Sequence, residues 1–260
     1  MKNFKKIVAV VLAVLAVAVM FIGCGKKSLT AEDGKLIMAT NASFPPYEFK
    51  DGENFAGIDV EIAGKIAEKL GLELEIKDVE FGSIIGGVQS GKFDMGMAGM
   101  TVTDERKKSV NFTDSYATGV QSVIVKENSS IKSFDDLKGD GSMKIGVQQD
   151  TTGDIYASDT TDNGGYGEAN VVRYKTGNEA VLALSKDKVQ AVIIDNEPAK
   201  SYVKTTGGLK ILDGAWVEEQ YAIAISKDND ELLNKINTAL KELTDDGTVK
   251  GIIDKYIQAN

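Results

Sequence analysis

Histidine is absent from this chain of 260 residues. Catalytic Ser-His-Asp and Cys-His sites, histidine general bases and imidazole metal ligands are therefore excluded. Cysteine occurs once, as Cys24, so neither an intramolecular disulfide nor a CxxC zinc or redox motif can form. An enzyme built on this chain would depend on carboxylates, lysine or tyrosine, and the sequence shows no motif for such a site. We expect no enzymatic activity, no metal and no cofactor.

Basic residues are few relative to acidic ones: 30 Lys and Arg stand against 39 Asp and Glu, a net charge of −9. Loss of the amino-terminal segment described next, with Lys2, Lys5 and Lys6, would bring the net charge to −12. Such a surface repels phosphate backbones, so nucleic acid is not an expected partner. The length and a hydrophobic content of 42% are sufficient for one large or two small packed domains.

Residues 1–23 are predicted to be an export signal, because a basic segment, MKNFKK, precedes an uncharged apolar run over residues 7–22. A run of this length could instead stay in the bilayer as a span, with Cys24 buried in it. The stretch FIGC resembles a bacterial lipobox, although Phe21 stands where leucine is commoner. That resemblance implies cleavage before a lipidated Cys24 and a tether over residues 24–34. The protein would then sit outside the cytoplasm on its membrane, on the outer face in a Gram-positive cell and the periplasmic side otherwise.

Beyond residue 35, short strand-like and helix-like runs alternate. Apolar residues at helical spacing predict helices over residues 59–70, 84–88 and 232–243 and helices that begin near 133, 152 and 178. The helix from residue 232 is expected to stop near Asp246 and Gly247, and a short helix to Tyr256 is expected to follow it. Apolar or alternating runs predict strands over residues 36–40, 72–76, 95–100, 122–125, 143–147, 170–174, 191–194 and 221–225. This order indicates parallel sheets covered by helices, and its recurrence after residue 120 predicts an α/β chain with two lobes. The polar segment over residues 159–168 is expected to be a surface loop.

Three separated segments carry a family resemblance: GIDVEIAGKIAEKLGL (57–72), FGSIIGGVQSGKFDMGMAGMTVTDERKKSVNFTDSY (81–116) and IGVQQDTTGDIYA (145–157). In these motifs and their spacing the chain resembles family 3 of the bacterial solute-binding proteins, over nearly all of residues 35–258. The family includes glutamine, histidine and lysine/arginine/ornithine receptors of ABC importers. The resemblance implies a type II periplasmic-binding-protein-like fold, in which two crossing strands join two lobes, each a mostly parallel sheet flanked by helices. Lobe I would comprise residues 35–119 and 221–260, and lobe II residues 120–220.

Arg106 is the candidate for binding a ligand carboxylate. A planar guanidinium donates two parallel N–H bonds to a carboxylate, whereas lysine offers a point charge. Arginine is rare here, since only Arg106 and Arg173 are found among the thirty basic residues. Thr103 and the acids after it predict a helix start beside Arg106. On spacing alone Arg106 could equally be a solvated charge, and it is the family resemblance that implies contact with a ligand.

The same resemblance implies contacts to both ends of a free amino acid. The carboxylate would meet Arg106, the hydroxyl of Thr101 and the start of the helix at Thr151 and Thr152. The ammonium would meet Asp195, Thr101 and the carbonyl of Gly99. The residues alone also allow plain strand positions for Thr101 and Gly99, and helix capping for the two threonines and Asp195.

Aromatic residues are implied to flank the aliphatic part of the ligand. Phe44 and Phe81 match the sandwiching positions, with Tyr47 behind them, although core packing is an alternative for both phenylalanines. Asn41 and Gln148 match positions that face the ligand side chain, and both are neutral.

One residue departs from the family pattern, because Asp150 stands where glycine is common. An inward carboxylate there would repel that of the ligand, so the side chain of Asp150 is expected to point to solvent.

The implied function is that of a monomeric receptor that closes around one free amino acid with a polar side chain, neutral or cationic, and delivers it to the permease subunits of an ABC importer. Two alternatives are an enzyme on the same fold and a sensor module that passes closure to a signalling partner. Sensor modules of this kind are usually fused to a kinase or channel, and this chain is expected to end at Asn260 without one.

Overall fold

The computed structural model describes residues 28–138, 142–214 and 216–257. Cys24 and the predicted signal lie outside this part of the chain. Among the described residues, no helix combines the length and apolar character needed to cross a membrane. Part of the predicted tether packs against the first lobe, where the backbone of Ala31 donates to Asp94 (2.6 Å) and the Leu29 carbonyl accepts from Asn229 (2.9 Å).

The first lobe is built on a five-stranded sheet with the order β5-β1-β6-β14-β7. Strands β5, β1 and β6 are parallel, and β14 runs antiparallel between β6 and β7. The bounds are β1 Lys35–Thr40, β5 Glu73–Asp78, β6 Met95–Gly96, β7 Val110–Phe112 and β14 Ala224–Ser226. Beside it lies a small antiparallel sheet of β2 (Ser43–Phe44), β3 (Glu48–Asp51) and β4 (Asn54–Ala56).

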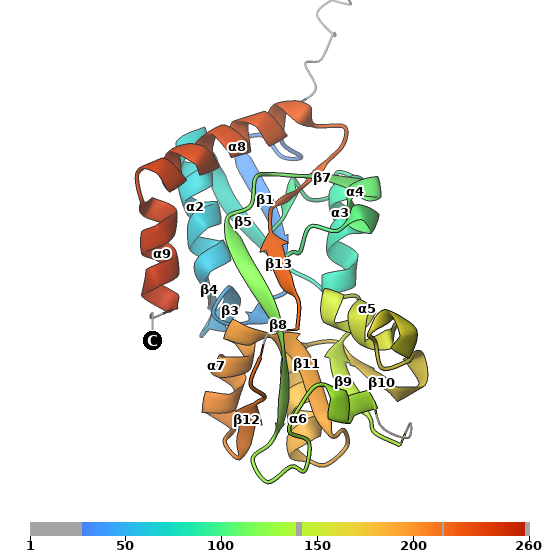
Figure 1. Cartoon of the computed structure of the whole chain (residues 1–260). Coiled ribbons are helices and arrows are strands. Elements are labelled where there is room, and N and C mark those ends of the chain that lie inside the picture. Colours follow the sequence, from blue (N-terminus) through green and yellow to red (C-terminus); the bar gives the residue numbers. More distant parts are fainter. Residues whose placement is uncertain (1–27, 139–141, 215, 258–260) are drawn as a thin grey trace, which may run out of the picture.

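Alternation along β1 sends side chains to both faces of this sheet. Leu36 and Met38 pack with α2, α8 and α9 in one buried cluster, whereas Ile37 and Ala39 pack with α3 in another. The helices on the two faces can be followed in Figure 1, with the bounds α2 Ile58–Leu70, α3 Ile84–Gln89, α8 Asp230–Asp245 and α9 Thr248–Tyr256. The predicted helical spacing is thus confirmed for these elements, and each one covers the sheet that precedes or follows it in the chain.

The second lobe has the sheet order β10-β9-β11-β8-β12, with β13 paired to β8. Strands β10, β9 and β11 are parallel, and β8 is antiparallel to β11 and β12. The bounds are β8 Ala117–Lys126, β9 Ile145–Gln148, β10 Val171–Tyr174, β11 Ala191–Asp195, β12 Leu209–Ile211 and β13 Glu218–Tyr221. The flanking helices are α5 Thr152–Ser158, α6 Gly177–Ser185 and α7 Asn196–Thr206.

Strands β8 and β13 run between the two lobes (Figure 1). They pair antiparallel, from Val120 opposite Glu218 to Ala117 opposite Tyr221. The two-lobed α/β fold with crossing strands is therefore confirmed. The residue boundaries of the lobes stay a prediction.

Three local predictions are wrong. The strand expected over residues 95–100 stops at Gly96, because the buried chain beyond it bends through Gly99, whose φ is +51°. The strand expected over residues 221–225 is two strands, because β13 pairs with β8 whereas β14 pairs with β6 and β7. The helix expected after Ser133 is a single 3-10 turn over Asp135–Lys138, although Ser133 does accept from the Asp136 backbone (3.4 Å).

Candidate functional site

A pocket lies between the lobes and is lined by residues of both. Ten predicted residues line it: Asn41, Phe44, Phe81, Gly99, Thr101, Arg106, Gln148, Thr151, Thr152 and Asp195. Two residues that were not predicted, Glu48 and Ala98, complete the wall. The structure thus brings the predicted residues together, while the ligand contact of each stays a prediction.

Arg106 is fixed in the pocket wall by its own helix and by the opposite lobe. It lies on α4 (Asp104–Ser109), where its backbone N–H donates to the Thr103 hydroxyl (3.1 Å), as the predicted cap requires. Nη1 donates to the Thr101 carbonyl (2.8 Å), and Nη2 donates across the cleft to the Asp150 carbonyl (3.1 Å). Burial lowers the pKa of Arg106, which is 9% exposed, but arginine remains charged in proteins. The two carbonyls orient the guanidinium and leave N–H groups for a carboxylate.

Phe81 lies beside this guanidinium, with the Arg106 Cζ 5.2 Å from the ring centre. Phe44 is buried and stacks on Tyr47 at 5.9 Å between ring centres. Tyr47 itself is 2% exposed and packs edge-on against Tyr221, so it supports the wall from behind and does not line the pocket. This placement agrees with the supporting position expected for Tyr47.

Asp195 ends β11, directly before α7. Its side chain makes no capping hydrogen bond to that helix, and instead Oδ1 accepts from the hydroxyl of Tyr221. Burial raises the pKa of Asp195 to about 7, and the negative charge of Glu219 adds to the rise. A buried carboxyl that has no cationic partner among the described residues suits an ammonium group.

The two threonines at the start of α5 differ in their surroundings. Thr151 is the helix cap, because its hydroxyl accepts from the Asp154 backbone (3.3 Å) and donates to the Gln148 carbonyl (2.7 Å). Thr152 is 3% exposed, with its hydroxyl 3.5 Å from that of Thr101. The capping alternative thus describes Thr151, whereas Thr152 meets a residue of the opposite lobe.

Gly99 needs to be glycine. Its φ is positive, and a Cβ would lie 2.8 Å from the ring of Phe44. Its backbone N–H donates to Asp59 Oδ2 (2.8 Å), which also accepts from the hydroxyl of Tyr116 (2.9 Å). This bond fixes the backbone that passes along the pocket from Gly99 to Thr101.

Asn41 and Gln148 meet across the cleft, where Gln148 Nε2 donates to Asn41 Oδ1 (2.9 Å). Asp150, two residues beyond Gln148, is exposed and does not line the pocket. Its φ is +65°, and its carboxylate lies against Gly82 of the first lobe. The solvent-facing position expected for Asp150 is therefore the one observed.

Two buried acids near the pocket were missed by the sequence analysis. Glu48 on β3 lines the pocket with 1% exposure, and Oε2 has no hydrogen-bond partner in the described structure. Burial, and then the charge of Asp59, raise the pKa of Glu48 well above its usual range. Its place shortly after Phe44 and Tyr47 puts it close to a predicted pocket residue in the chain, but no sequence signal indicates that this acid is buried.

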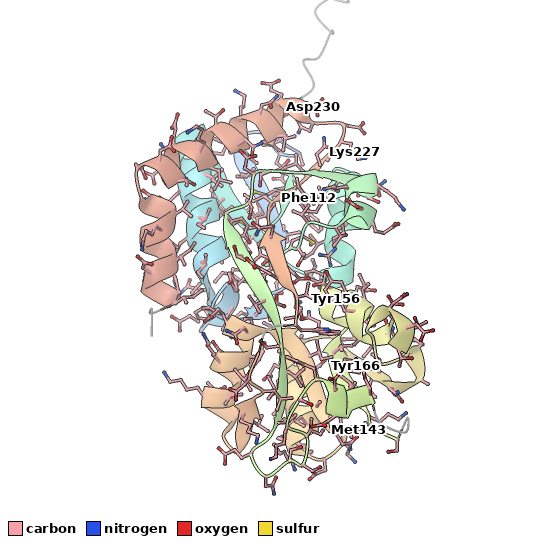
Figure 2. The ribbon with its side chains drawn as sticks, viewed as in Figure 1. Phe112, Met143, Tyr156, Tyr166, Lys227 and Asp230 are labelled. Atoms are coloured by element: carbon pink, nitrogen blue, oxygen red, sulfur yellow. The ribbon has the colours of Figure 1, made fainter. Side chains whose placement is uncertain are left out.

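Glu219 on β13 is the second missed acid, 4% exposed, and no sequence signal separates it from its polar neighbours. It accepts from the hydroxyl of Thr101 (3.1 Å) and from Gln121 Nε2 (3.0 Å). Tyr156 of α5 lies where that helix meets the first lobe (Figure 2), and burial together with Glu219 raises its pKa to about 12. Glu219 therefore connects a crossing strand to the wall of the pocket.

A pocket split between two lobes, with a guanidinium on one wall and a carboxylate on the other, defines a two-lobed ligand-binding protein. The chain belongs to the bacterial extracellular solute-binding proteins, family 3, whose model matches residues 36–259.

A curated relative is the arginine-binding extracellular protein ArtP of Bacillus subtilis (strain 168), 36% identical over 90% of this chain and 91% of the relative. Among solved structures, an ancestral arginine-binding protein bound to arginine is 42% identical with a TM-score of 0.79, covering 86% of this chain and 98% of that one. The ancestral amino acid-binding protein AncCDT-1, a precursor of cyclohexadienyl dehydratase, is 32% identical with a TM-score of 0.78, covering 86% of this chain and 96% of that one. The relatives named here are binding proteins, and one of them precedes an enzyme on the same fold.

Proposed function

We propose that this protein is the substrate-binding component of an ABC importer, which captures a polar L-amino acid between its lobes and delivers it to the permease. One observation carries the proposal: Arg106 and Asp195 line a single pocket from opposite lobes. Removal of a zwitterion from water costs several kcal/mol per charge unless each charge gains a partner. One guanidinium for the α-carboxylate and one carboxylate for the α-ammonium supply those partners.

The mechanism follows from the division of the site. A ligand that contacts both walls gains its full set of interactions in the closed state alone, and so it shifts the population towards closure. The crossing strands β8 and β13 act as the hinge. We place the lobe boundaries near residues 119/120 and 220/221, within this pair of strands. The permease would recognise the closed form, and no chemical step on the ligand is proposed.

We further propose that acylated Cys24 anchors the mature chain to its membrane, because FIGC follows a basic and then apolar segment. Mass spectrometry of membrane fractions should detect a mature species that begins at lipid-modified Cys24. A mature species that retains Met1 would contradict the anchor and would leave the binding function untouched.

Thermal shift measurement against the twenty amino acids, ornithine and cystine tests the binding function. A ligand at 1,000 times its Kd stabilises the folded state by about 4 kcal/mol, which raises Tm measurably. We expect one amino acid or a small related group to raise Tm, and the Arg106→Ala variant to show a clearly smaller rise at the same ligand concentration. If no amino acid in the panel raises Tm, the proposed function is wrong.

A further inference from the structure

We propose that Glu48 carries a proton at neutral pH in the unliganded protein and donates a hydrogen bond to Asp59, and that this acid pair positions the backbone of the pocket at Gly99. Glu48 lines the pocket, whereas Asp59 lies in the first turn of α2 and does not line it. Neither acid takes part in the contacts proposed above for the two ends of an amino acid. The inference therefore goes beyond the proposed function and does not depend on the identity of the ligand.

Backbone contacts at the start of α2 bring the two acids together. The Tyr47 carbonyl accepts from the backbone N–H of Asp59 (2.9 Å). Gly57, directly before α2, permits this close approach, because a Cβ there would lie 2.2 Å from the Tyr47 carbonyl oxygen. Glu48 follows Tyr47 as the first residue of β3. Its side chain therefore reaches Asp59, and the two carboxyl groups form a hydrogen bond.

Both carboxyl groups are buried, with 1% exposure for Glu48 and 0% for Asp59. Each has one buried oxygen, Glu48 Oε2 and Asp59 Oδ1, that no N–H or O–H group of the described residues reaches. Two ionised carboxylates cannot form a hydrogen bond, because each of them only accepts. A single proton between the two groups supplies the missing donor and removes the repulsion between like charges.

The surroundings assign this proton to Glu48. Asp59 Oδ2 already accepts from the Gly99 backbone (2.8 Å) and from the hydroxyl of Tyr116 (2.9 Å), and the first turn of a helix favours a negative charge. Burial raises the pKa of Asp59 to about 6, and these hydrogen bonds limit the rise. Burial, the charge of Asp59 and the hydrogen bond to it raise the pKa of Glu48 well above its usual range. Asp59 is therefore the ionised acceptor at neutral pH, and Glu48 is the donor.

The other ionisable groups that face the pair come from several elements and include no cation among the described residues. They are Asp195 at the end of β11, Tyr202 on α7, Tyr116 directly before β8 and Tyr47 directly before β3. The charge of Asp195 adds to the rise in the pKa of Glu48. A second negative charge at the pair would thus have no counter-charge, and a proton on Glu48 avoids it.

The pair acts on the pocket through Asp59. Asp59 holds the backbone N–H of Gly99, and Gly99 lines the pocket. If Glu48 lost its proton, two negative charges would lie at hydrogen-bonding distance, and their repulsion would move Asp59 away from Gly99. Glu48 is therefore a positioning residue for this part of the pocket wall, and the wall should loosen when the proton is lost in alkaline solution.

Infrared spectroscopy tests the proton directly, because the C=O stretch of a protonated carboxyl is absent from a carboxylate. The unliganded mature chain is measured at pH 8, with isotope-labelled glutamate to separate glutamate bands from aspartate bands. We expect a protonated glutamate in the wild type and none in the Glu48→Gln variant. A wild-type spectrum without a protonated glutamate would overturn the inference even if the variant does not fold. A band that persists in the folded variant would also overturn it.

The pH dependence of unfolding is a second test. A carboxyl whose pKa is raised in the folded state stabilises the protein fully below its unfolded pKa, about 4.3 for glutamate, and this stability is lost as pH rises towards the folded-state pKa. Glu48→Gln donates an amide N–H to Asp59 without binding a proton. Its unfolding equilibrium constant, measured with urea, should therefore improve relative to the wild type by up to about tenfold per pH unit between pH 5 and pH 7.

The control for this test is Glu53→Gln, which removes an exposed acid between β3 and β4. Its stability relative to the wild type should not change over the same pH range. A Glu48→Gln variant that also keeps a constant ratio to the wild type would contradict the proton on Glu48.

Glu48→Met tests the positioning role, because methionine fills similar space but donates no hydrogen bond to Asp59. Hydrogen exchange of the Gly99 amide, followed by NMR, should be at least about tenfold faster in Glu48→Met than in Glu48→Gln. Circular dichroism establishes that both variants are folded. Equal exchange rates in the two variants would remove the positioning role. All of these measurements use the unliganded protein, so their failure leaves the proposed function intact, and failure of amino acids to bind leaves this inference intact.

Discussion

The two lobes contribute unequal numbers of residues to the wall of the pocket. Eight of the twelve lining residues come from the first lobe, namely Asn41, Phe44, Glu48, Phe81, Ala98, Gly99, Thr101 and Arg106, and four come from the second, namely Gln148, Thr151, Thr152 and Asp195. The first lobe holds both phenylalanines and the one cation, so it offers most of a binding site by itself. The second lobe adds the counter-charge for the ammonium. The difference indicates that a ligand docks on the first lobe and that the second lobe closes over it.

The charged residues of the two walls are nevertheless not independent. Arg106 of the first lobe is oriented partly by the carbonyl of Asp150 in the second. Asp195 of the second lobe is oriented by Tyr221, the last residue of a crossing strand. Each wall thus depends on the other, or on the hinge, for the position of its charged group. We expect substitutions on the two walls to weaken ligand binding to different extents.

The largest effect is expected from Arg106→Ala on the first wall. This change leaves the ligand carboxylate without its partner and should weaken binding by about 2 to 5 kcal/mol, or at least about 30-fold. Arg106→Lys keeps the charge, loses the paired N–H donors and should fall between the wild type and the alanine variant. Calorimetry measures both, and an affinity for Arg106→Ala within about threefold of the wild type would contradict the assignment.

A smaller, pH-dependent effect is expected from Asp195 on the second wall. Since its pKa is raised to about 7, the empty protein holds a proton on this carboxyl at lower pH, and the ligand ammonium has to displace that proton. Affinity should therefore fall as pH falls through 7, and Kd at pH 6 should be about tenfold higher than at pH 8. Facing Asp195 are Tyr221 and Glu219 from β13 and Gln121 from β8.

The Asp195→Asn variant tests whether Asp195, and not another carboxyl group, causes this pH dependence of Kd. The variant should bind about tenfold to 100-fold more weakly at pH 8, and its Kd should change less between pH 6 and pH 8 than that of the wild type. An unchanged slope of Kd against pH in the variant would assign the titration to a different group.

The smallest effect is expected at the rim of the cleft. Lys175 and Glu80 form an ion pair across the lobes (2.6 Å), but their side chains are 71% and 64% exposed. Because solvent and salt screen such pairs, Glu80→Gln should weaken binding by less than about threefold, and 0.5 M salt should abolish the difference. Glu68→Gln is the control, since its ion pair with Lys65 lies within α2. A loss above tenfold for Glu80→Gln would show that the rim contributes more to closure than its exposure suggests.

The local pattern of apolar and polar residues was sufficient to predict most of the fold. Helix α2 could be predicted because Ile62 and Ile66 repeat at the spacing of one buried face, and the strand at β1 because its residues are apolar and bounded by polar ones. The switch of sheets between Tyr221 and Ala224 could not be predicted, since the run of apolar residues is continuous there. Which sheet a strand joins depends on its distant partners and not on its own residues.

The residues of the site also differ in whether the sequence could reveal them. Arg106 and Asp195 could be singled out because the family resemblance implies that they contact a ligand, whereas their own positions in the sequence also allow a solvated charge and a helix cap. Glu48 could not, because acidic side chains are nearly always exposed and its burial depends on packing against distant parts of the chain, where Asp59 lies close to it. The two acids that were missed, Glu48 and Glu219, are both buried, and burial of an acid is decided by packing between distant parts of the chain.

The antiparallel ladder between β8 and β13 has a mechanical consequence. A single strand between two bodies would let them twist and slide freely, whereas two hydrogen-bonded strands with a fixed register resist sliding along their length. The remaining soft motion is bending of the ribbon as a whole. The two lobes therefore close along one path, and in each closure the same backbone atoms return to the same opposing positions.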